Sequence, residues 1–406
     1  MGTLTSPPAV VTITAKLALE DGSVYRGESI GAEGGSVGEV VFNTSLSGYQ
    51  EIFTDPSYNG QMVVMTNPLI GNYGINPEDE ESFRPHPRGI IVKELSRRPS
   101  NFRARGDLRG YLRKHGLVGI AGVDTRAITK RLRTAGSLKG IIATGDVDDP
   151  RMERREASNE VLAEKARAWP GLGGIDMVAE VSCDKPYVWK KGLDSPFAAC
   201  FRANRPVERI GEGLRVAAFD YGIKHNILRI LAEMGFEVHV LPAKATAAQA
   251  RALKPDGIFL SNGPGDPAGL PYAIEAIRNL IGDYPTFGIC LGHQLTSLAL
   301  GARTFKLKFG HHGGNHPVKN LVTGKVEISV QNHCYAVDPE TLPPGAKPYF
   351  QNLNDQSLEG LYHTELPVFA VQFHPESSPG PNDFTFLFDQ FAGMIRRKAP
   401  LDPRTR

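Results

Sequence analysis

The stretch RVAAFDYGIKHNILRILAEMGFEVHVLPA, residues 215–243, sets the architecture of the second half of the chain. A strand-like apolar run is followed by an amphipathic helical repeat and then by another strand-like run. The alternation continues downstream, with expected helices at 247–254, 272–281 and 291–301 and expected strands at 256–260 and 286–290. Strands that alternate with helices of this length predict right-handed crossovers and a mainly parallel sheet. Ligands of such sheets bind beyond the carboxyl ends of the strands.

The first half of the chain has a less regular pattern. Residues 16–31 alternate apolar and polar side chains around Asp21-Gly22, which is typical of a hairpin. Residues 107–144 predict the order helix, strand, helix, strand. We therefore expect a mixed α/β domain over residues 12–190, an aperiodic linker over 191–213 and an α/β domain over 214–398.

Composition and charge exclude several classes of protein. The chain has 406 residues, of which 41% are hydrophobic and 22% charged, and its formal net charge of +2 gives no basic field for nucleic acid. No apolar run approaches the ~18 residues of a membrane-spanning helix, and the N-terminus has no secretory signal pattern. The four cysteines, Cys183, Cys200, Cys290 and Cys334, form no C-x-x-C pair. This spacing argues against a disulfide framework or a thiolate metal site, and we expect a reducing cytoplasm.

Cys290 lies in TFGICLGHQL, residues 286–295, where an expected strand meets an expected helix. G-x-C-x-G is the cysteine counterpart of the G-x-S-x-G nucleophile elbow. Gly288 and Gly292 would relieve the crowding of so sharp a turn because they lack a Cβ. The unpaired N–H groups at the helix N-terminus favour negative charge on the sulfur. The alternative is a buried structural cysteine beside packing glycines, but the strand-to-helix context favours a nucleophile.

Two further segments supply what a nucleophilic cysteine needs. His374 ends an expected strand at 367–373, and the carboxylate of Glu376 can turn back to its imidazole, so Cys290, His374 and Glu376 fit the roles of a triad. The turn SNGPGDPAG, residues 261–269, could direct backbone N–H groups, with that of Leu291, at an oxyanion. Taken alone, each segment also fits an ordinary surface turn.

Together, Cys290, H-P-E at 374–376 and N-G-P-G-D-P at 262–267 resemble the class I (triad) glutamine amidotransferases. The resemblance continues through F-G-H-H-G-G-N-H-P-V and Q-N-H downstream of the cysteine. The first half contains F-N-T-S-L-S-G-Y-Q-E-I-F-T-D-P-S-Y at 42–58, G-N-Y-G-I-N at 71–76 and G-V-D-T-R-A-I-T at 122–129. These segments resemble the small, glutamine-hydrolysing subunits of carbamoyl phosphate synthetases. The resemblance implies an N-terminal docking domain followed by an amidotransferase domain with a flavodoxin-like sheet.

The resemblance also implies residue roles. Cys290 would attack the side-chain amide of L-glutamine, His374 would transfer protons, and Glu376 would hold the imidazole. The expected glutamine-binding residues are Ser57, Gly263, Gly265, Leu291, Gln294, Asn332, Cys334 and Tyr335. Where many relatives have N-H-G-F, this chain has Asn332-His333-Cys334-Tyr335. The change matters little if Cys334 and Tyr335 contribute backbone groups, whereas a Cys334 side chain in the pocket would alter the affinity for glutamine. Because Ser57 comes from the first domain, the site is expected at a domain interface.

No resident cofactor or metal is expected in this chain. His311, His312 and His316 form H-H-x-x-x-H, but the intervening Gly-Gly-Asn favours a turn, so these residues are expected to pack and to form hydrogen bonds. A G-x-x-x-x-G-K-[ST] phosphate loop is also missing. The resemblance therefore implies a separate large subunit, which would use ATP and a divalent cation to make carbamoyl phosphate from bicarbonate and ammonia, for arginine or pyrimidine biosynthesis or both. The partners would be L-glutamine and that subunit, in a heterodimer or a higher-order assembly of heterodimers, without nucleic acid or membrane. The alternatives are an amidotransferase subunit for anthranilate or GMP synthesis, which the first-domain motifs disfavour, and a non-catalytic regulatory scaffold.

Overall fold

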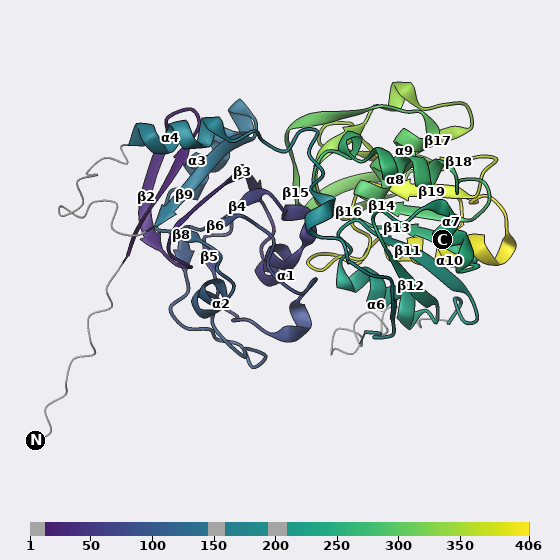
Figure 1. The fold of residues 1–406 in the computed structure, drawn as a ribbon, viewed down its shortest axis with the longest axis horizontal. Helices are drawn as coiled ribbons and strands as arrows, with labels where there is room; N and C mark the ends of the chain where they lie inside the picture. The colour runs from purple at the N-terminus through teal and green to yellow at the C-terminus, as the bar shows by residue number, and fades with distance from the viewer. Residues whose placement is uncertain (1–12, 145–158, 194–208, 406) are drawn as a thin grey trace, which may run out of the picture.

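The computed structural model describes residues 13–144, 159–193 and 209–405, in two α/β domains that lie side by side (Figure 1). The α/β fold class predicted from the sequence is confirmed. Most of the expected linker, residues 194–208, lies outside the described residues. The segment just before it, β10 (Tyr187–Trp189), pairs antiparallel with a strand of the second domain. Among the described helices, none is both long and apolar enough to span a membrane.

The first domain is built on a closed barrel with the strand order β1-β2-β8-β6-β4-β3-β9. Its strands are β1 (Thr14–Leu19), β2 (Val24–Ser29), β3 (Gly35–Asn43), β4 (Gln61–Met65), β6 (Gly89–Ile91), β8 (Gly119–Ala121) and β9 (Leu138–Thr144). Its helices are α1 (Tyr49–Thr54), α2 (Leu108–Lys114), α3 (Thr125–Ala135) and α4 (Asn159–Ala168), and a separate short pair joins β5 (Leu69–Ile70) to β7 (Glu94–Leu95).

The local predictions for this domain hold. Strands β1 and β2 form the antiparallel hairpin around Asp21-Gly22, and α2, β8, α3 and β9 follow in the expected order. Asp107 and Asp124 begin the two helices, because each aspartate accepts a hydrogen bond from a backbone N–H of the first turn. The closure of the barrel was not predicted. It depends on β9, which pairs with both β1 and β3, more than 90 residues earlier in the chain.

The second domain contains a sheet of ten strands in the order β10-β12-β11-β13-β14-β19-β18-β17-β15-β16. Its centre is parallel and consists of β11 (Arg215–Asp220), β12 (Glu237–Pro242), β13 (Gly257–Leu260), β14 (Thr286–Ile289) and β19 (Val368–Val371). Antiparallel strands extend it, namely β15 (Thr304–Asn320), β16 (Val326–Val337), β17 (Ala346–Asn352) and β18 (Leu358–His363). The helices are α6 (His225–Glu233), α7 (Ala247–Ala252), α8 (Pro271–Arg278), α9 (Leu291–Leu300) and α10 (Phe386–Arg397).

Helices cover both faces of the parallel centre. Val216 and Ala218 of β11 belong to the apolar core that contains residues of α6 and α10. Ala217 and Phe219, which alternate with them along the strand, belong to the core that contains residues of α7, α8 and α9. Burial on both faces explains why these strands are apolar throughout. Because these strands are parallel, their carboxyl ends all lie at one edge of the sheet, where Cys290 follows β14.

The expected turn at His311–His316 is wrong. These residues lie within β15, which spans 17 residues and pairs with both β16 and β17. Shifts of register between Lys306 and His311 and between Gly313 and His316 absorb the glycine-rich segment as bulges. Gly310, whose φ is 72°, has the left-handed conformation that such an irregularity requires. The ladder hydrogen bonds from neighbouring strands therefore override the local turn preference.

Candidate active site

Cys290 occupies the strand-to-helix turn between β14 and α9, as predicted. Its φ of 53° and ψ of −103° are unusual for a residue with a side chain. A Cβ on Gly288 would lie 2.7 Å from the carbonyl oxygen of Gly292, and a Cβ on Gly292 would lie 2.2 Å from that of Leu260. Both positions therefore require glycine, because β14, α9 and β13 approach one another too closely for a methyl group. In the present arrangement the Cys290 thiol donates to the carbonyl of Asn332, at 3.5 Å.

His374 and Glu376 form a buried pair at the end of β19. His374 Nδ1 lies 2.7 Å from Glu376 Oε1, and both side chains are at most 1% exposed. The backbone N–H of His374 donates to the carbonyl of Val330 at 2.9 Å, which ties this segment to β16. His374 Nε2 has no hydrogen-bond partner among the described residues. The imidazole is thus held through one nitrogen, and the other is left for a reacting group.

Lys224, which sequence reasoning missed, completes this buried group. Its ammonium lies 2.9 Å from Glu376 Oε1 and also donates to the carbonyl of Ser377. Burial would raise the pKa of Glu376, but Lys224 and His374 outweigh that effect and lower it to about 2. Burial would lower the pKa of His374, but the Glu376 carboxylate and the neighbouring Cys290 raise it above its ordinary value. These directions favour an imidazolium beside a carboxylate at neutral pH.

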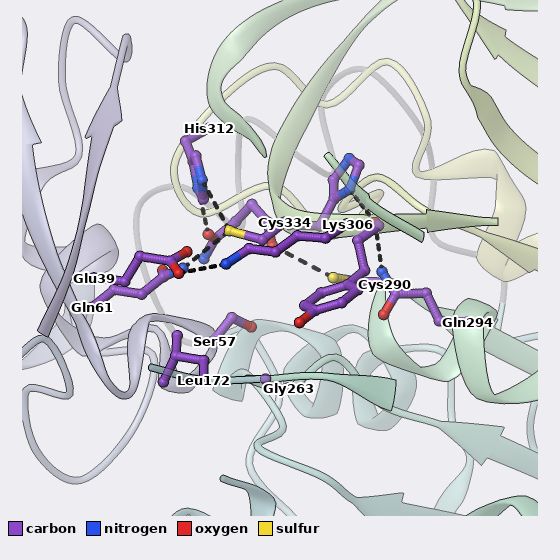
Figure 2. A pocket seen from close by; sticks show the side chains of 14 residues that line it. Glu39, Ser57, Gln61, Leu172, Gly263, Cys290, Gln294, Lys306, His312 and Cys334 are labelled. Atoms are coloured by element: carbon purple, nitrogen blue, oxygen red, sulfur yellow. Dashed lines mark hydrogen bonds and ion pairs between the residues drawn. The ribbon is translucent and has the colours of Figure 1, made fainter. Parts of the chain in front are cut away.

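A pocket opens beside Cys290 and is lined by residues of both domains. Figure 2 shows Cys290 and Gln294 on one side of it, Ser57 and Gly263 near its floor, and Glu39, Gln61 and Cys334 on the opposite side. All the residues expected to contact glutamine line this pocket, except Leu291, which follows Cys290 directly. Gln294 is fixed by hydrogen bonds from Nε2 to the Tyr335 carbonyl at 2.9 Å and to Gln372 Oε1 at 3.1 Å.

Asp55 holds the first-domain part of the pocket in place. Its Oδ1 accepts from the backbone N–H of Ser57 at 2.9 Å, and its Oδ2 accepts from Asn332 Nδ2 of β16 at 2.8 Å. The Ser57 hydroxyl in turn accepts from Asn262 Nδ2 at 3.0 Å. All four residues are at most 6% exposed. Asp55 therefore positions a first-domain hydroxyl against the catalytic edge of the second domain.

A charged pair also crosses between the domains at this pocket. Lys306 Nζ of β15 lies 2.5 Å from Glu39 Oε2 of β3, and Gln61 Nε2 of β4 donates to Cys334 Sγ at 3.1 Å (Figure 2). The Cys334 side chain thus faces the pocket, on the side away from Cys290. Burial raises the pKa of the Cys334 thiol well above its ordinary value, which keeps it protonated at neutral pH.

Family models match both halves of the chain. Residues 17–142 match the model described as "Carbamoyl-phosphate synthase small chain, CPSase domain", and residues 217–394 match "Glutamine amidotransferase class-I". A carbamoyl phosphate synthase small chain of Syntrophotalea carbinolica is 51% identical over 94% of this chain and 98% of its own length. The chain belongs to the carbamoyl phosphate synthase small-chain family. It is accordingly a glutamine amidotransferase subunit, as the sequence motifs predicted.

A plant small chain is similar over a comparable length. The chloroplastic small chain of Oryza sativa subsp. japonica is 51% identical over 94% of this chain and 82% of its own. Among solved structures, a glutamine amidotransferase of Thermotoga maritima covers 47% of this chain and 87% of its own, at 20% identity and a TM-score of 0.34. A small chain implies a large-chain partner. The first-domain match also removes the alternative of an anthranilate- or GMP-type subunit.

The sequence predicted Cys290, His374 and Glu376 as a triad, and the structure adds residues around them that sequence reasoning missed. Lys224 follows the carboxyl end of β11, which the parallel-sheet rule marks as a ligand-facing edge, so that signal was present. Asp55 stands two residues before Ser57, where an Asp-Pro-Ser turn suggests an N-cap. Glu39 and Lys306 had no comparable signal, because only the docking of the two domains brings them together. Next to the pocket, which His333 also lines, His311, His333 and Glu359 have ligand atoms within 4.8 Å of one another.

Proposed function

We propose that this small chain hydrolyses L-glutamine at Cys290, with His374 and Glu376 as its catalytic partners, and supplies the ammonia to a large chain. The observation that carries the proposal is the 2.7 Å contact between His374 Nδ1 and Glu376 Oε1. This contact leaves Nε2 available beside a cysteine that sits on a nucleophile elbow and lines a two-domain pocket. Family membership gives the class of reaction, and the roles of individual residues are inferred from this geometry.

In the first half of the reaction, the Cys290 thiolate attacks the side-chain carboxamide carbon of glutamine. The carbonyl π electrons move to oxygen, where the N–H groups of Leu291 and Gly263 would stabilise the negative charge. Leu291 is the first residue of α9, so its N–H has no partner within the helix. The imidazolium of His374 then gives its proton to the departing nitrogen, the C–N bond breaks, and ammonia leaves a glutamyl thioester on the sulfur.

The second half reverses the role of the imidazole. Neutral His374 takes a proton from water as the water oxygen attacks the thioester carbon, and the C–S bond breaks to give glutamate and the Cys290 thiolate. Glu376 keeps the imidazole oriented and favours its charged form, and Lys224 keeps Glu376 ionised. The thiol now contacts Asn332 rather than His374, so we expect bound glutamine to turn the sulfur towards the imidazole.

Ser57, Gly265, Gln294, Asn332, Cys334 and Tyr335 are proposed to hold the amino-acid part of glutamine, because they surround the pocket around Cys290. The reaction at Cys290 uses only protein groups, so we propose that this chemistry needs no cofactor. ATP and a divalent cation would act on the large chain, which would consume the ammonia and bicarbonate. The carbamoyl phosphate formed would serve arginine or pyrimidine biosynthesis, or both. We propose a cytoplasmic location, supported by the free cysteines Cys183, Cys290 and Cys334, although the rice relative is named as chloroplastic.

The test is a reconstitution with the cognate large chain. The complex should form carbamoyl phosphate from bicarbonate and ATP with either glutamine or ammonium as the nitrogen source. In a complex containing Cys290→Ala, the glutamine-dependent rate should fall to the background, whereas the ammonium-dependent rate should stay within twofold of the wild type. An equal loss with both nitrogen sources would show assembly failure and count against the assigned role of Cys290. Retention of both rates would refute it.

A further inference from the structure

Three buried side chains from β15, β16 and β18 converge beside the glutamine pocket. His311 of β15 and His333 of β16 are directly opposite each other in the antiparallel register. Glu359 of β18 faces them, with its Oε1 3.6 Å from His311 Nδ1. One nitrogen or oxygen atom from each lies within 4.8 Å of the other two, and the residues are at most 6% exposed. Tetrahedral zinc, with bonds of about 2.0–2.1 Å to His and Glu, needs ligand atoms about 3.3 Å apart. The three side chains must therefore move closer together when they bind the ion.

If both rings are neutral, their outer hydrogen bonds select the tautomers in which a lone pair faces this space. His333 Nδ1 lies 2.7 Å from the carbonyl of Tyr335, which can only accept, so Nδ1 carries the hydrogen and Nε2 carries the lone pair. His311 Nε2 lies 2.8 Å from Asp355 Oδ2, and donation to that carboxylate leaves Nδ1 as the lone-pair atom. Metal-binding histidines characteristically make such an outer bond to a carbonyl or carboxylate.

In the part of the chain that the structure describes, no cation binds the inward-facing atoms through a hydrogen bond. His311 Nδ1 and His333 Nε2 are buried without a hydrogen-bond partner. Glu359 is fully buried and accepts from Asn352 Nδ2 at 2.8 Å and from Gln331 Nε2 at 2.9 Å, but both donors are neutral amides. Buried carboxylates are generally paired with a cation or bound to a metal. The two imidazole lone pairs and the Glu359 carboxylate would together attract a positive ion.

We propose that His311, His333 and Glu359 form a binding site for one divalent zinc-type ion. Two imidazoles and one carboxylate are a ligand set suited to Zn²⁺, and a water molecule would take the fourth position. The ion joins β15, β16 and β18, and it fixes the strand that contributes Asn332 and Cys334 to the glutamine pocket. Its role is structural, because all three ligands are buried and neither Cys290 nor His374 is among them. This site departs from the sequence-based expectation of no metal, and it does not depend on the roles proposed for Cys290 or His374.

The competing arrangement is a protonated His311 held between Asp355 and Glu359. That imidazolium would donate from both nitrogens and would neutralise the buried carboxylate without an ion. It leaves His333 Nε2 without a partner, however, and the 3.6 Å separation between His311 Nδ1 and Glu359 Oε1 is too long for a good hydrogen bond. The metal accounts for both of these features.

The test measures metal content and the spectrum of bound Co²⁺ in the full chain, purified without a histidine tag. After chelation, reloading and dialysis, we expect about one equivalent of Zn²⁺ per chain. Co²⁺ should give tetrahedral d–d bands without the charge-transfer bands of a thiolate ligand. The variants Glu359→Gln and His311→Asn should each bind Co²⁺ at least tenfold more weakly. Circular dichroism and the elution volume of each variant show whether it has folded.

Two matched variants locate the ion. Cys290→Ser removes the thiol beside His374 and Glu376, and this variant should retain one equivalent of Zn²⁺. His239→Gln removes a partly exposed histidine that contacts Glu237 at 2.6 Å, and it should also retain one equivalent. The proposal is overturned if the wild-type chain retains less than about one-fifth of an equivalent, as the protonated His311 predicts. It is equally overturned if folded Glu359→Gln and His311→Asn bind Co²⁺ as tightly as the wild type, or if thiolate bands appear and disappear with Cys290→Ser.

Discussion

The substitution Gly292→Ala tests the elbow that presents Cys290. The added Cβ would lie 2.2 Å from the carbonyl oxygen of Leu260 and 2.7 Å from its carbonyl carbon. Close carbon–oxygen contacts are about 3.3 Å or longer, so α9 and the end of β13 must separate by about 1 Å. The Gly292 N–H, which donates to the Ser261 carbonyl at 3.0 Å, is strained by the same movement. Because Leu260 leads into the turn that carries Gly263, the shift widens the proposed oxyanion site.

Two opposing effects determine how far Gly292→Ala changes the free energy of unfolding. Alanine in place of glycine in a helix contributes up to about 1 kcal/mol of stability. Overpacking costs about 1–3 kcal/mol, and the upper part of that range applies here because a backbone carbonyl cannot rotate away as a side chain can. We therefore expect Gly292→Ala to lower the free energy of unfolding by about 1–2 kcal/mol. A misplacement of about 1 Å at the reacting groups should lower kcat by about 100-fold.

The assay is glutamate release under saturating glutamine, together with urea unfolding of the same preparations. Gly106→Ala is the matched control, since a Cβ at this exposed position meets no atom within 4 Å. Its kcat should stay within twofold of the wild type and its stability within about 0.5 kcal/mol. A Gly292→Ala chain with wild-type kcat and wild-type stability would refute the argument that the glycine is required by close backbone approach.

Three further substitutions and one labelling experiment probe the site. Glu376→Gln should lower kcat by about 10²–10⁴-fold, because the amide no longer stabilises the imidazolium of His374. It should also destabilise the fold by leaving the Lys224 ammonium with one fewer carboxylate. The folded-state pKa of Glu376 is lowered to about 2, so its contribution to stability is fully present above the unfolded pKa of about 4.3. Denaturation curves should show a gap between wild type and variant that is constant above about pH 5 and narrows as the pH falls towards 2. Ser57→Ala should raise KM for glutamine by about tenfold with little change in kcat, because a hydrogen bond to a charged substrate group is worth about 1.5 kcal/mol; a fall in kcat with unchanged KM would contradict this role. Cys334→Gly should keep kcat within threefold, since the Cys334 side chain lies on the side of the pocket away from Cys290. Alkylation at neutral pH should modify Cys290 well before Cys334 or Cys183, because burial raises the pKa of the latter two thiols, that of Cys183 to about 12; mass spectrometry of the digested chain identifies the modified residue.

The features that the sequence predicted correctly are those with a local cause. The Cys290 elbow follows from two glycines spaced around a strand-to-helix junction, and the β1–β2 hairpin follows from Asp21-Gly22 between alternating residues. The parallel centre follows from strands and helices of regular length. In each case the residues that determine the structure are neighbours in the chain.

The features that were missed depend on pairings between distant segments. β9 closes the first barrel only because β1 and β3 lie on either side of it. The segment around His311 becomes a strand because β16 pairs with it, against the turn preference of its glycines. Likewise, Asp55 reaches Asn332 only once the two domains are in contact. Local sequence patterns carry no information about these contacts.

The account depends most directly on Cys290 being the atom that forms a covalent bond with the donor amino acid. Incubation with a diazo-ketone analogue of glutamine, followed by mass spectrometry of the digested chain, tests this. The account predicts one adduct, on the peptide that contains Cys290, with glutamate release falling in proportion to the labelled fraction and with glutamine slowing the labelling. Full turnover by a chain in which Cys290 is completely modified, or an adduct on Cys334 alone that abolishes turnover, would contradict it.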